Sequence, residues 1–577
     1  MALRALRPRL PVELAAWTRT PTFSRPLSTS LPRPSSSSDE TFYVTTPIFY
    51  VNADPHIGHL HSTLLADVYA RYARLRDPQK GAVMLTGTDE HGMKIQRVAE
   101  AKGVSPKELC DGVSRRFRDL AAAGNIDHQI FMRTTEERHR TAVEHVWREL
   151  NKRGYIYKSS YAGWYAVSDE AYVPEGQVGE VIDPKSGEKY MASTETGTRV
   201  EWMEEENYKF RLSAFREPLL KWLQSSPLPV QPPSRTTALV SSVTQPSSTD
   251  LNDLSISRPS SRLSWGIPVP DDPDHTIYVW IDALVNYLTG AGYPWKGGEA
   301  FAEGKVWPPD LQVVGKDIIR FHALYLPAVL MALDLPLPKH ILTHGHWTMD
   351  KFKMSKSRGN VANPFEAMQL WGRDAMRMYL MRVGGNSASD ADYSAVEIER
   401  FYRKDLAGQM GNLLNRIANK KLLKKLEAPE LLYTLPAELG AEDEGLKKML
   451  EELPATFDGH LRSFEIHRAL SACFDVLSES NKHVQLLSPW LATATPQEAH
   501  RALFFGSESL RLVGILLQPF MPEKAAQLLD MLGVPAERRR WEDAVLGEGG
   551  ERTPKMGKTH LWPSVAVPVQ EDAELAK

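Results

Sequence analysis

Residues 42–60 read FYVTTPIFYVNADPHIGHL. The opening FYVTT is rich in β-forming residues and stops at Pro47, and after a short polar stretch apolar side chains recur at helical spacing from Ile57 onward. A second β-rich run, AVMLT at 82–86, is followed by the turn GTDEHG at 87–92 and another helical pattern. Strand, turn and helix in repeated order predict a parallel sheet of the α/β class.

The same strand-then-helix signal returns at 276–281 and 311–314, and a further strand pattern lies at 341–343. The text between the two α/β parts is aromatic and turn-rich, which is typical of a small inserted domain. Its stretch 225–250 is rich in Ser, Pro and Thr, and we expect a loop or disorder there. The sequence therefore predicts a leader at 1–38, a first α/β half at 39–130, an inserted domain at 131–264, a second α/β half at 265–395 and a helical region at 396–577.

Composition excludes several classes of protein. The chain has 577 residues, 42% of them hydrophobic, which is enough for a large buried core. No run of about 18 apolar residues occurs, so no membrane span and no membrane partner are expected. The two cysteines, Cys110 and Cys473, are too few for a disulfide scaffold or a cysteine zinc knuckle.

Positive charge is concentrated in two places. Residues 1–38 hold six arginines, no lysine and one acid, Glu13, a composition typical of a mitochondrial transit peptide, although a disordered basic tail is an alternative. The net charge is −3, and setting aside the +5 of this leader leaves −8, so a nucleic-acid partner would need a local basic patch. Residues 400–425 carry eight basic side chains against one acid, Asp405, and are the candidate patch, although a lysine-rich run is usually a solvated helix face.

The motif PHIGH stands where the first predicted helix begins. Helix N-termini offer unpaired N–H groups to phosphates, Gly58 would let a nucleotide approach the backbone, and His56 and His59 could donate hydrogen bonds to phosphate oxygens. Two alternatives remain: the histidines are simply polar residues of a first turn, or they join other histidines around zinc. The other histidines of that second reading are His61, His344 and His346.

A second phosphate motif follows the later strands. Residues 352–360 read FKMSKSRGN, and Lys353, Ser355, Lys356 and Ser357 could wrap a polyphosphate, with an ammonium stabilising charge on a leaving group. The alternative is a basic surface loop. Other nucleotide motifs fail, because Met93 stands where a Walker loop needs lysine and no G-x-G-x-x-G occurs.

PHIGH together with KMSKS resembles the paired signature of the class I aminoacyl-tRNA synthetases. The segments TTPIFYVN, TGTDEHG, VWIDALVNY and VGKDIIRFH, in that order, are similar to the methionyl branch, and the arginine-rich leader is similar to its mitochondrial members. The resemblance, over about 41–500, implies a Rossmann-like catalytic domain, an inserted connective domain and a helical-bundle anticodon-binding domain. It implies ligation of L-methionine to tRNA(Met) through methionyl-adenylate, with ATP and Mg²⁺, by a monomer of the mitochondrial matrix.

The resemblance also assigns residues. His56, His59, Lys353 and Lys356 would be catalytic, and ATP would contact these four with Gly58, Ser355 and Ser357. Asp89 would bind the ammonium of methionine and Arg258 would lie near its charged end. The remaining pocket residues would be Pro47, Ile48, Tyr50, Trp280, Ala283, Tyr287, Ile318 and His322. Core packing is the alternative for each aromatic residue, and Leu284 replaces a proline common in the family, which affects one wall contact.

Anticodon recognition would fall to Asn412, Arg416 and Trp490. Asn412 and Arg416 are four apart, so they share a helix face, and Trp490 could stack on a loop base or be a buried core residue. No cysteine occurs between Cys110 and Cys473, so no structural zinc is expected and no metal ligand is assigned. Two other function classes stay open: a nucleotidylyltransferase for a small substrate, and a catalytically silent RNA-binding relative.

Overall fold

A computed structural model of the chain describes residues 41–166, 171–173, 175–183, 187–194, 196–245, 251–295, 306–349, 351–354, 361–426, 433–550 and 561–565. The predicted leader at 1–38 lies outside these ranges, as do Ser355, Lys356 and Ser357, and the side chain of Lys353 is also outside the description.

A seven-stranded parallel sheet forms the centre of the catalytic part, and its order is β10-β16-β15-β1-β3-β2, with β4 paired to β3. The two predicted α/β halves form one sheet, because β1 from the first half pairs with β15 from the second. The strands are β1 (Phe42–Thr45), β2 (Phe49–Tyr50), β3 (Ala82–Asp89), β4 (Ile130–Arg133), β10 (Val230–Gln231), β15 (Leu311–Gly315) and β16 (Ile341–His344).

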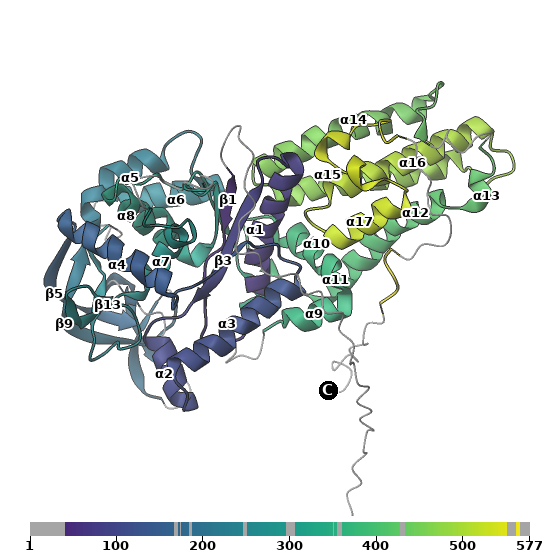
Figure 1. Ribbon diagram of the computed structural model, residues 1–577. Coiled ribbons are helices and arrows are strands. Elements are labelled where there is room, and N and C mark those ends of the chain that lie inside the picture. Colours follow the sequence, from purple (N-terminus) through teal and green to yellow (C-terminus); the bar gives the residue numbers. More distant parts are fainter. Residues whose placement is uncertain are drawn as a thin grey trace, which may run out of the picture.

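Helices cover both faces of this sheet (Figure 1). Neighbouring residues of β1 point to opposite faces: Val44 packs in one core with α1, and Tyr43 packs in another with α4, α7 and α8. Both are fully buried, as expected for a parallel sheet between helices. The helices of this part are α1 (Ile57–Arg76), α2 (Met93–Lys102), α3 (Pro106–Ala123), α4 (Glu137–Lys152), α5 (Arg216–Leu223), α7 (Val279–Gly290) and α8 (Leu326–Ala332). The predicted α/β fold is confirmed.

The segment between α4 and α7 contains an antiparallel sheet, which Figure 1 shows at the far side of the catalytic part from the helical region. Its order is β11-β9-β5-β6, built on the long pair of β5 and β9. The strands are β5 (Ile156–Ala166), β6 (Ala171–Val173), β9 (Val200–Phe210) and β11 (Leu254–Ser255), with the hairpin β7 (Val178–Ile182) and β8 (Lys189–Ser193) and the sheet of β12 (Ser257–Pro259), β13 (Pro268–Val269) and β14 (Asp272–Ile277).

The prediction of a loop or disorder at 225–250 is wrong for residues 230–244, which form a strand and a helix. Strand β10 joins the catalytic sheet through Val230 and pairs with Ile341 of β16, and helix α6 (Pro233–Thr244) follows directly. Leu239 and Val243, one helical turn apart, are buried and pull the helix onto the core. Composition pointed to disorder because Ser, Pro and Thr are numerous, but two well-spaced apolar residues and one sheet edge outweigh that tendency.

The C-terminal part is helical, as predicted, and Figure 1 shows its long helices packed side by side. A small sheet of β17 (Trp347–Met349), β18 (Phe352–Lys353) and β19 (Ala391–Asp392) lies before it. A buried ion pair between Arg377 and Asp67, 2.6 Å long, joins α10 to α1. The helices are α9 (Pro364–Trp371), α10 (Arg373–Gly384), α11 (Ala395–Phe401), α12 (Asn412–Ile417), α13 (Lys420–Leu423), α14 (Ala441–Arg462), α15 (Ile466–Leu487), α16 (Pro496–Leu516) and α17 (Pro522–Met531).

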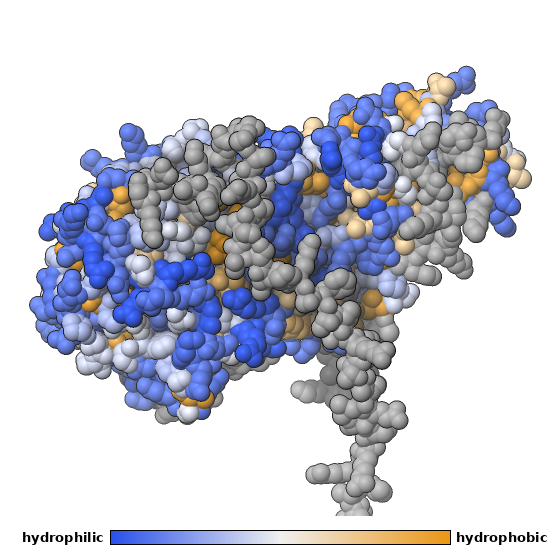
Figure 2. All heavy atoms as spheres, in the orientation of Figure 1, coloured by the Kyte–Doolittle hydropathy of each residue, from blue (hydrophilic) through white to orange (hydrophobic). Residues whose placement is uncertain are grey.

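The described surface that Figure 2 shows is mostly hydrophilic, with hydrophobic side chains scattered over it. Among the described residues, no helix combines the length and apolarity that crossing a bilayer requires.

Candidate active site

A cavity of about 450 Å³ opens at the carboxyl ends of the parallel strands. Two pairs of neighbouring residues on adjacent strands border this cavity. Tyr50 lies beside Asp89 at the ends of β2 and β3, and Gly315 lies beside His344 at the ends of β15 and β16. Doubly wound sheets place their ligands at this edge. The lining residues are Pro47, Ile48, Phe49, Tyr50, His56, Gly58, His59, Ser62, Asp89, Lys94, Val279, Trp280, Ala283, Leu284, Tyr287, Gly315, Asp317, Ile318, His322, His344, Gly345, His346, Trp347 and Met354.

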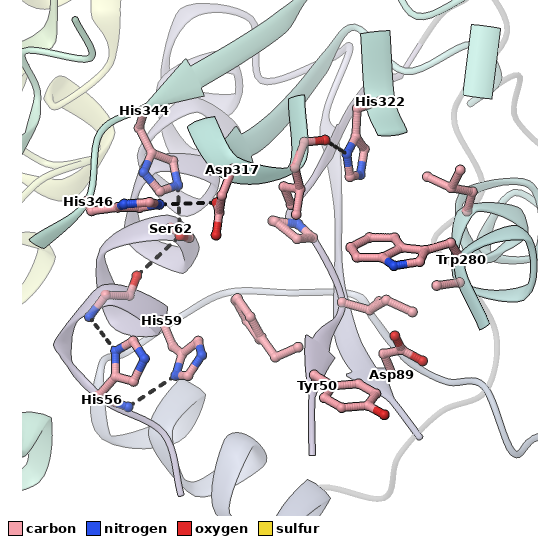
Figure 3. Close-up of a pocket in the computed structure, with 18 of the residues that line it drawn as sticks. Tyr50, His56, His59, Ser62, Asp89, Trp280, Asp317, His322, His344 and His346 are labelled. Atoms are coloured by element: carbon pink, nitrogen blue, oxygen red, sulfur yellow. Dashed lines mark hydrogen bonds and ion pairs between the residues drawn. The ribbon is translucent and has the colours of Figure 1, made fainter. Parts of the chain in front are cut away.

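The N-terminus of α1 presents two oriented imidazoles to this cavity (Figure 3). His56 caps the helix, since its Nδ1 accepts from the N–H of Gly58 at 3.1 Å, and Nδ1 of His59 accepts from the N–H of His56 at 3.1 Å. A backbone N–H can only donate, so Nδ1 is an acceptor in both rings and each ring carries its hydrogen on Nε2. The rings stack with centroids 3.8 Å apart. They form a pair of N–H donors suited to phosphate oxygens.

Glycine is required at position 58 by this cap. A Cβ added there would lie 2.9 Å from Cε1 of His56, closer than real Cβ contacts allow. Any side chain would therefore displace the imidazole that caps the helix. Sequence reasoning assigned Gly58 to close approach of the nucleotide; the structure adds that the glycine also makes room for His56.

The same end of the cavity contains polar residues to which sequence reasoning assigned no role with ATP or methionine, although it named His344 and His346 as possible zinc ligands. Nε2 of His344 lies 2.8 Å from Oγ of Ser62, and Nε2 of His346 lies 3.1 Å from Asp317 (Figure 3). Ser62 follows Gly58 by one helical turn, so helical spacing alone could have indicated it. His344 and His346 thus contact different partners, Ser62 and Asp317. Within the described ranges no cluster of three or more His, Cys, Asp or Glu is placed to hold a metal ion.

The opposite end is mostly apolar. Nδ1 of His322 lies 3.0 Å from the carbonyl of Ile318, which can only accept, so Nδ1 carries the hydrogen and Nε2 accepts from the Tyr287 hydroxyl at 2.7 Å. Burial lowers the pKa of His322 to about 4, so the ring is neutral near pH 7. Trp280 stacks on Phe321 with centroids 3.6 Å apart. Aromatic walls with one oriented hydroxyl suit a soft thioether chain.

Asp89 supplies the negative charge at this end. It closes β3, is 8% exposed and faces the cavity together with Tyr50 and Trp280 (Figure 3). Lys94, which sequence reasoning missed, also lines the cavity, with its Nζ 6.0 Å from the Tyr50 ring centre. A carboxylate beside an apolar chamber can bind the ammonium of an amino acid whose side chain enters that chamber.

Nearly all residues predicted for the methionine pocket meet in this cavity: Pro47, Ile48, Tyr50, Asp89, Trp280, Ala283, Tyr287, Ile318 and His322. Arg258 is the exception. It is 2% exposed and lies over the rings of Tyr165, Tyr172 and Tyr278, while its Nη1 donates to the carbonyl of Ser257 at 2.6 Å. The structure therefore does not bring Arg258 into the wall of the cavity, where sequence reasoning expected it near the substrate's charged end.

The described part of the KMSKS segment, Lys353 and Met354, borders the cavity. Met354 lines the cavity, and Lys353 lies in β18, which pairs with β17. Asp392 of β19 anchors this hairpin, because its Oδ1 accepts from Oγ1 of Thr348 at 2.5 Å and from the N–H of Lys351 at 3.0 Å.

The three residues predicted for the anticodon come together on the helical region, far from the cavity in sequence. The guanidinium of Arg416 lies 5.7 Å from the ring centre of Trp490 and donates to the carbonyl of Asn481 at 3.1 Å. Asn412 donates to the Asn481 side chain at 3.1 Å. Trp490 is 41% exposed, just after α15, so its indole is available to a ligand.

Comparisons with known proteins agree with this geometry. Residues 42–418 match the family of class I tRNA synthetases (M), and residues 435–555 match the anticodon binding domain of methionyl tRNA ligase. The chain is 46% identical over 528 residues to a probable mitochondrial methionine–tRNA ligase of Neurospora crassa, covering 90% of this chain and 83% of that protein. It is 43% identical over 528 residues to the mitochondrial methionine–tRNA ligase of Homo sapiens, covering 89% and 87%.

The fold is shared with a solved structure as well. Mycobacterium tuberculosis methionyl-tRNA synthetase in complex with methionyl-adenylate superposes with a TM-score of 0.81 at 36% identity, over 91% of this chain and 100% of that one. Sequence family, relatives and structural neighbour agree along nearly the whole described chain. The chain belongs to the class I aminoacyl-tRNA synthetases, in their methionyl branch.

Proposed function

We propose that the cavity activates L-methionine with ATP and that the helical region, residues 396–577, binds the anticodon of tRNA(Met). Family membership assigns the overall reaction, which is ATP-dependent ligation of methionine to tRNA through methionyl-adenylate. One observation supports a phosphate end and a methionine end within the cavity. The Nε2–H donors of His56 and His59 at the N-terminus of α1 line the same cavity as the carboxylate of Asp89, which lies beside an apolar aromatic chamber.

In the first step a carboxylate oxygen of methionine attacks the α-phosphorus of ATP and pyrophosphate leaves. ATP enters as its Mg²⁺ complex, so the ion belongs to the substrate. His56 and His59 would donate hydrogen bonds to phosphate oxygens, and Lys353 and Lys356 would stabilise charge on the departing pyrophosphate, assisted by Ser355 and Ser357. No covalent enzyme intermediate is needed, because alignment and charge stabilisation are sufficient for this displacement.

Methionine would bind with its ammonium on Asp89 and its thioether among Trp280, Ala283 and Tyr287. The neutral His322 keeps the Tyr287 hydroxyl oriented, which fixes the polar feature of an otherwise apolar chamber. In the second step the 3′-terminal ribose hydroxyl of tRNA attacks the carbonyl carbon of the adenylate, and AMP leaves.

Methionine-dependent exchange of labelled pyrophosphate into ATP tests the first step. The proposal expects exchange with methionine and ATP alone. A nucleotidylyltransferase for another small substrate would exchange only with that substrate, and a silent RNA-binding relative would not exchange at all. Each alternative thus has its own outcome in one assay.

Trp490→Ala is expected to separate the two half-reactions. Loss of base stacking costs roughly 1–3 kcal/mol, so kcat/KM for methionine transfer to tRNA should fall about ten- to a hundredfold. Pyrophosphate exchange in the absence of tRNA should stay near wild type, because Trp490 does not line the cavity. Measurement of both activities and of the melting temperature decides; equal losses with a lower melting temperature would mean that the indole only packs.

The Neurospora crassa and Homo sapiens relatives are named as mitochondrial, and we propose the mitochondrial matrix as the site of action. Removal of residues 1–38 is expected to abolish import into isolated mitochondria and to leave aminoacylation unchanged. The arginine-rich, acid-poor leader supports the first result, and the start of β1 at Phe42 supports the second. A truncated protein that imports normally, or that fails to fold, would contradict the assignment.

We also propose a monomer without structural zinc. The absence of cysteine between Cys110 and Cys473 supports the absence of structural zinc, since structural zinc sites of the relevant kind are built from cysteine pairs. Elemental analysis of the purified protein should find no stoichiometric zinc, and about one tightly held ion per chain would contradict the proposal.

A further inference from the structure

Behind the cavity wall, the carboxylate of Asp282 joins two histidines from different elements. Its Oδ2 accepts from Nδ1 of His91 at 2.6 Å, and its Oδ1 accepts from Nε2 of His139 at 2.7 Å. Asp282 and His139 are 1% and 0% exposed. Burial alone would raise the pKa of Asp282, but the two histidines outweigh it and hold that pKa at about 2, so the carboxylate is ionised and accepts both bonds.

The network ties together the two walls that would hold methionine. Asp282 lies in the first turn of α7, between the lining residues Trp280 and Ala283, while His91 follows Asp89 by two residues. The bond from Asp282 to His91 therefore fixes the distance between the helix that carries Trp280 and the end of β3, which carries Asp89.

His139 supports Asp282 from the far side. It belongs to α4, and its Nδ1 lies 2.9 Å from Oγ1 of Thr289, about two turns after Asp282 along α7. The Thr289 hydroxyl has one hydrogen, which can go to His139 or to the carbonyl of Val285 at 3.1 Å. In both arrangements Nε2 of His139 keeps the hydrogen that it donates to Asp282.

The residue between Asp89 and His91 is held separately. Glu90 is fully buried, and its carboxylate accepts from Arg133 at 2.7 and 2.9 Å and from Thr135 at 2.6 Å. The backbone that carries Asp89 is thus anchored in the direction of β4 by Glu90 and in the direction of α7 by His91. Only Asp89 of these three lines the cavity.

We propose that Asp282 is a positioning residue for methionine. Through His91 and His139 it holds the end of β3 and helix α7 at the separation that lets one methionine molecule contact Asp89 and Trp280 together. The inference rests on the proposed assignment of this cavity to methionine. Asp282 itself does not line the cavity, so its effect is on the geometry of the residues that do. The phosphate end, built on α1, does not depend on this network.

Asp282→Asn keeps the size of the side chain but turns one acceptor into a donor, which then faces a histidine N–H. Steady-state pyrophosphate exchange with the full chain should show the KM for methionine raised about tenfold or more, as for a lost hydrogen bond to a charged group, and the KM for ATP unchanged. A purely structural role would lower the melting temperature or the amount of active enzyme and would leave both KM values alone.

A second pair of variants keeps the test decisive if Asp282→Asn does not fold. His91→Asn retains a donor near the position of Nδ1, whereas His91→Leu has none. The proposal expects His91→Leu to raise the KM for methionine and His91→Asn to restore it toward the wild-type value. Equal KM values in these two variants, or an unchanged KM in Asp282→Asn, would overturn the proposal.

The helical region offers a matched control. Asp443 accepts from Nε2 of His483 at 2.6 Å and is fully buried, so Asp443→Asn also breaks a buried His–Asp bond, but far from the cavity in the chain. It should lower stability and leave the KM for methionine unchanged. Absence of methionine-dependent exchange in the unaltered chain would instead contradict the proposed function, before any variant is compared.

Discussion

Asp89→Asn is expected to raise the KM for methionine in pyrophosphate exchange by about a hundredfold or more. Removing one partner of a buried, hydrogen-bonded charge pair costs about 2–5 kcal/mol, and each 1.4 kcal/mol is a factor of about ten. Asp89 is 8% exposed, so water cannot replace the lost carboxylate at the ammonium. The asparagine keeps the shape of the side chain, and the KM for ATP should change little.

A methionine analogue that lacks the amino group provides the control. The wild-type chain should use this analogue poorly, and Asp89→Asn should use it no worse than wild type does, because the analogue has no ammonium for the carboxylate to bind. If the substitution weakened methionine and the analogue equally, Asp89 would be a structural residue of β3 and the assignment of the ammonium site would be wrong.

Lys356→Ala is expected to lower kcat of pyrophosphate exchange by about a hundred- to a thousandfold, the effect of removing one group that stabilises transition-state charge. The ammonium would act on pyrophosphate as its charge develops, so the loss should fall on kcat and leave the KM for methionine nearly intact. An unchanged kcat would remove Lys356 from the catalytic residues.

Lys351→Asn is the matched control for that substitution. Lys351 is an exposed residue five positions earlier, and its backbone N–H, which asparagine retains, bonds Asp392. Its φ of 64° is also a conformation that asparagine tolerates. The variant removes one positive charge from the turn between β17 and β18, close to Lys356 in the sequence, and should leave both kcat and KM unchanged. It thereby separates a specific role of Lys356 from a general effect of charge.

Local sequence patterns were sufficient for the main elements of the fold. The β-rich FYVTT, the helical spacing from Ile57 and the strand at 82–86 all became elements of the parallel sheet and its helices, because periodicity records which face of an element is buried. The helix at 233–244 was missed because its apolar face has only a few residues in a Ser- and Thr-rich stretch, so its periodicity is weak. It is stabilised by the neighbouring edge of the sheet, and no local pattern in the sequence reveals that contact.

The sequence by itself was enough to predict which residues carry the chemistry of the site, because PHIGH and KMSKS are contiguous motifs whose residue types suit phosphate and leaving-group charge, and the resemblance of TGTDEHG to the family adds Asp89 for the ammonium. Only the tertiary structure decided which of them share one cavity. It joined Asp89 to Trp280 through a strand edge and a helix nearly 200 positions apart, kept Arg258 in a cage of tyrosines outside the cavity wall, and revealed Asp282 between two histidines. The physical reason is that pairing of β1 with β15 and packing of α7 against α4 are contacts between distant segments, and local periodicity contains no information about distance in space.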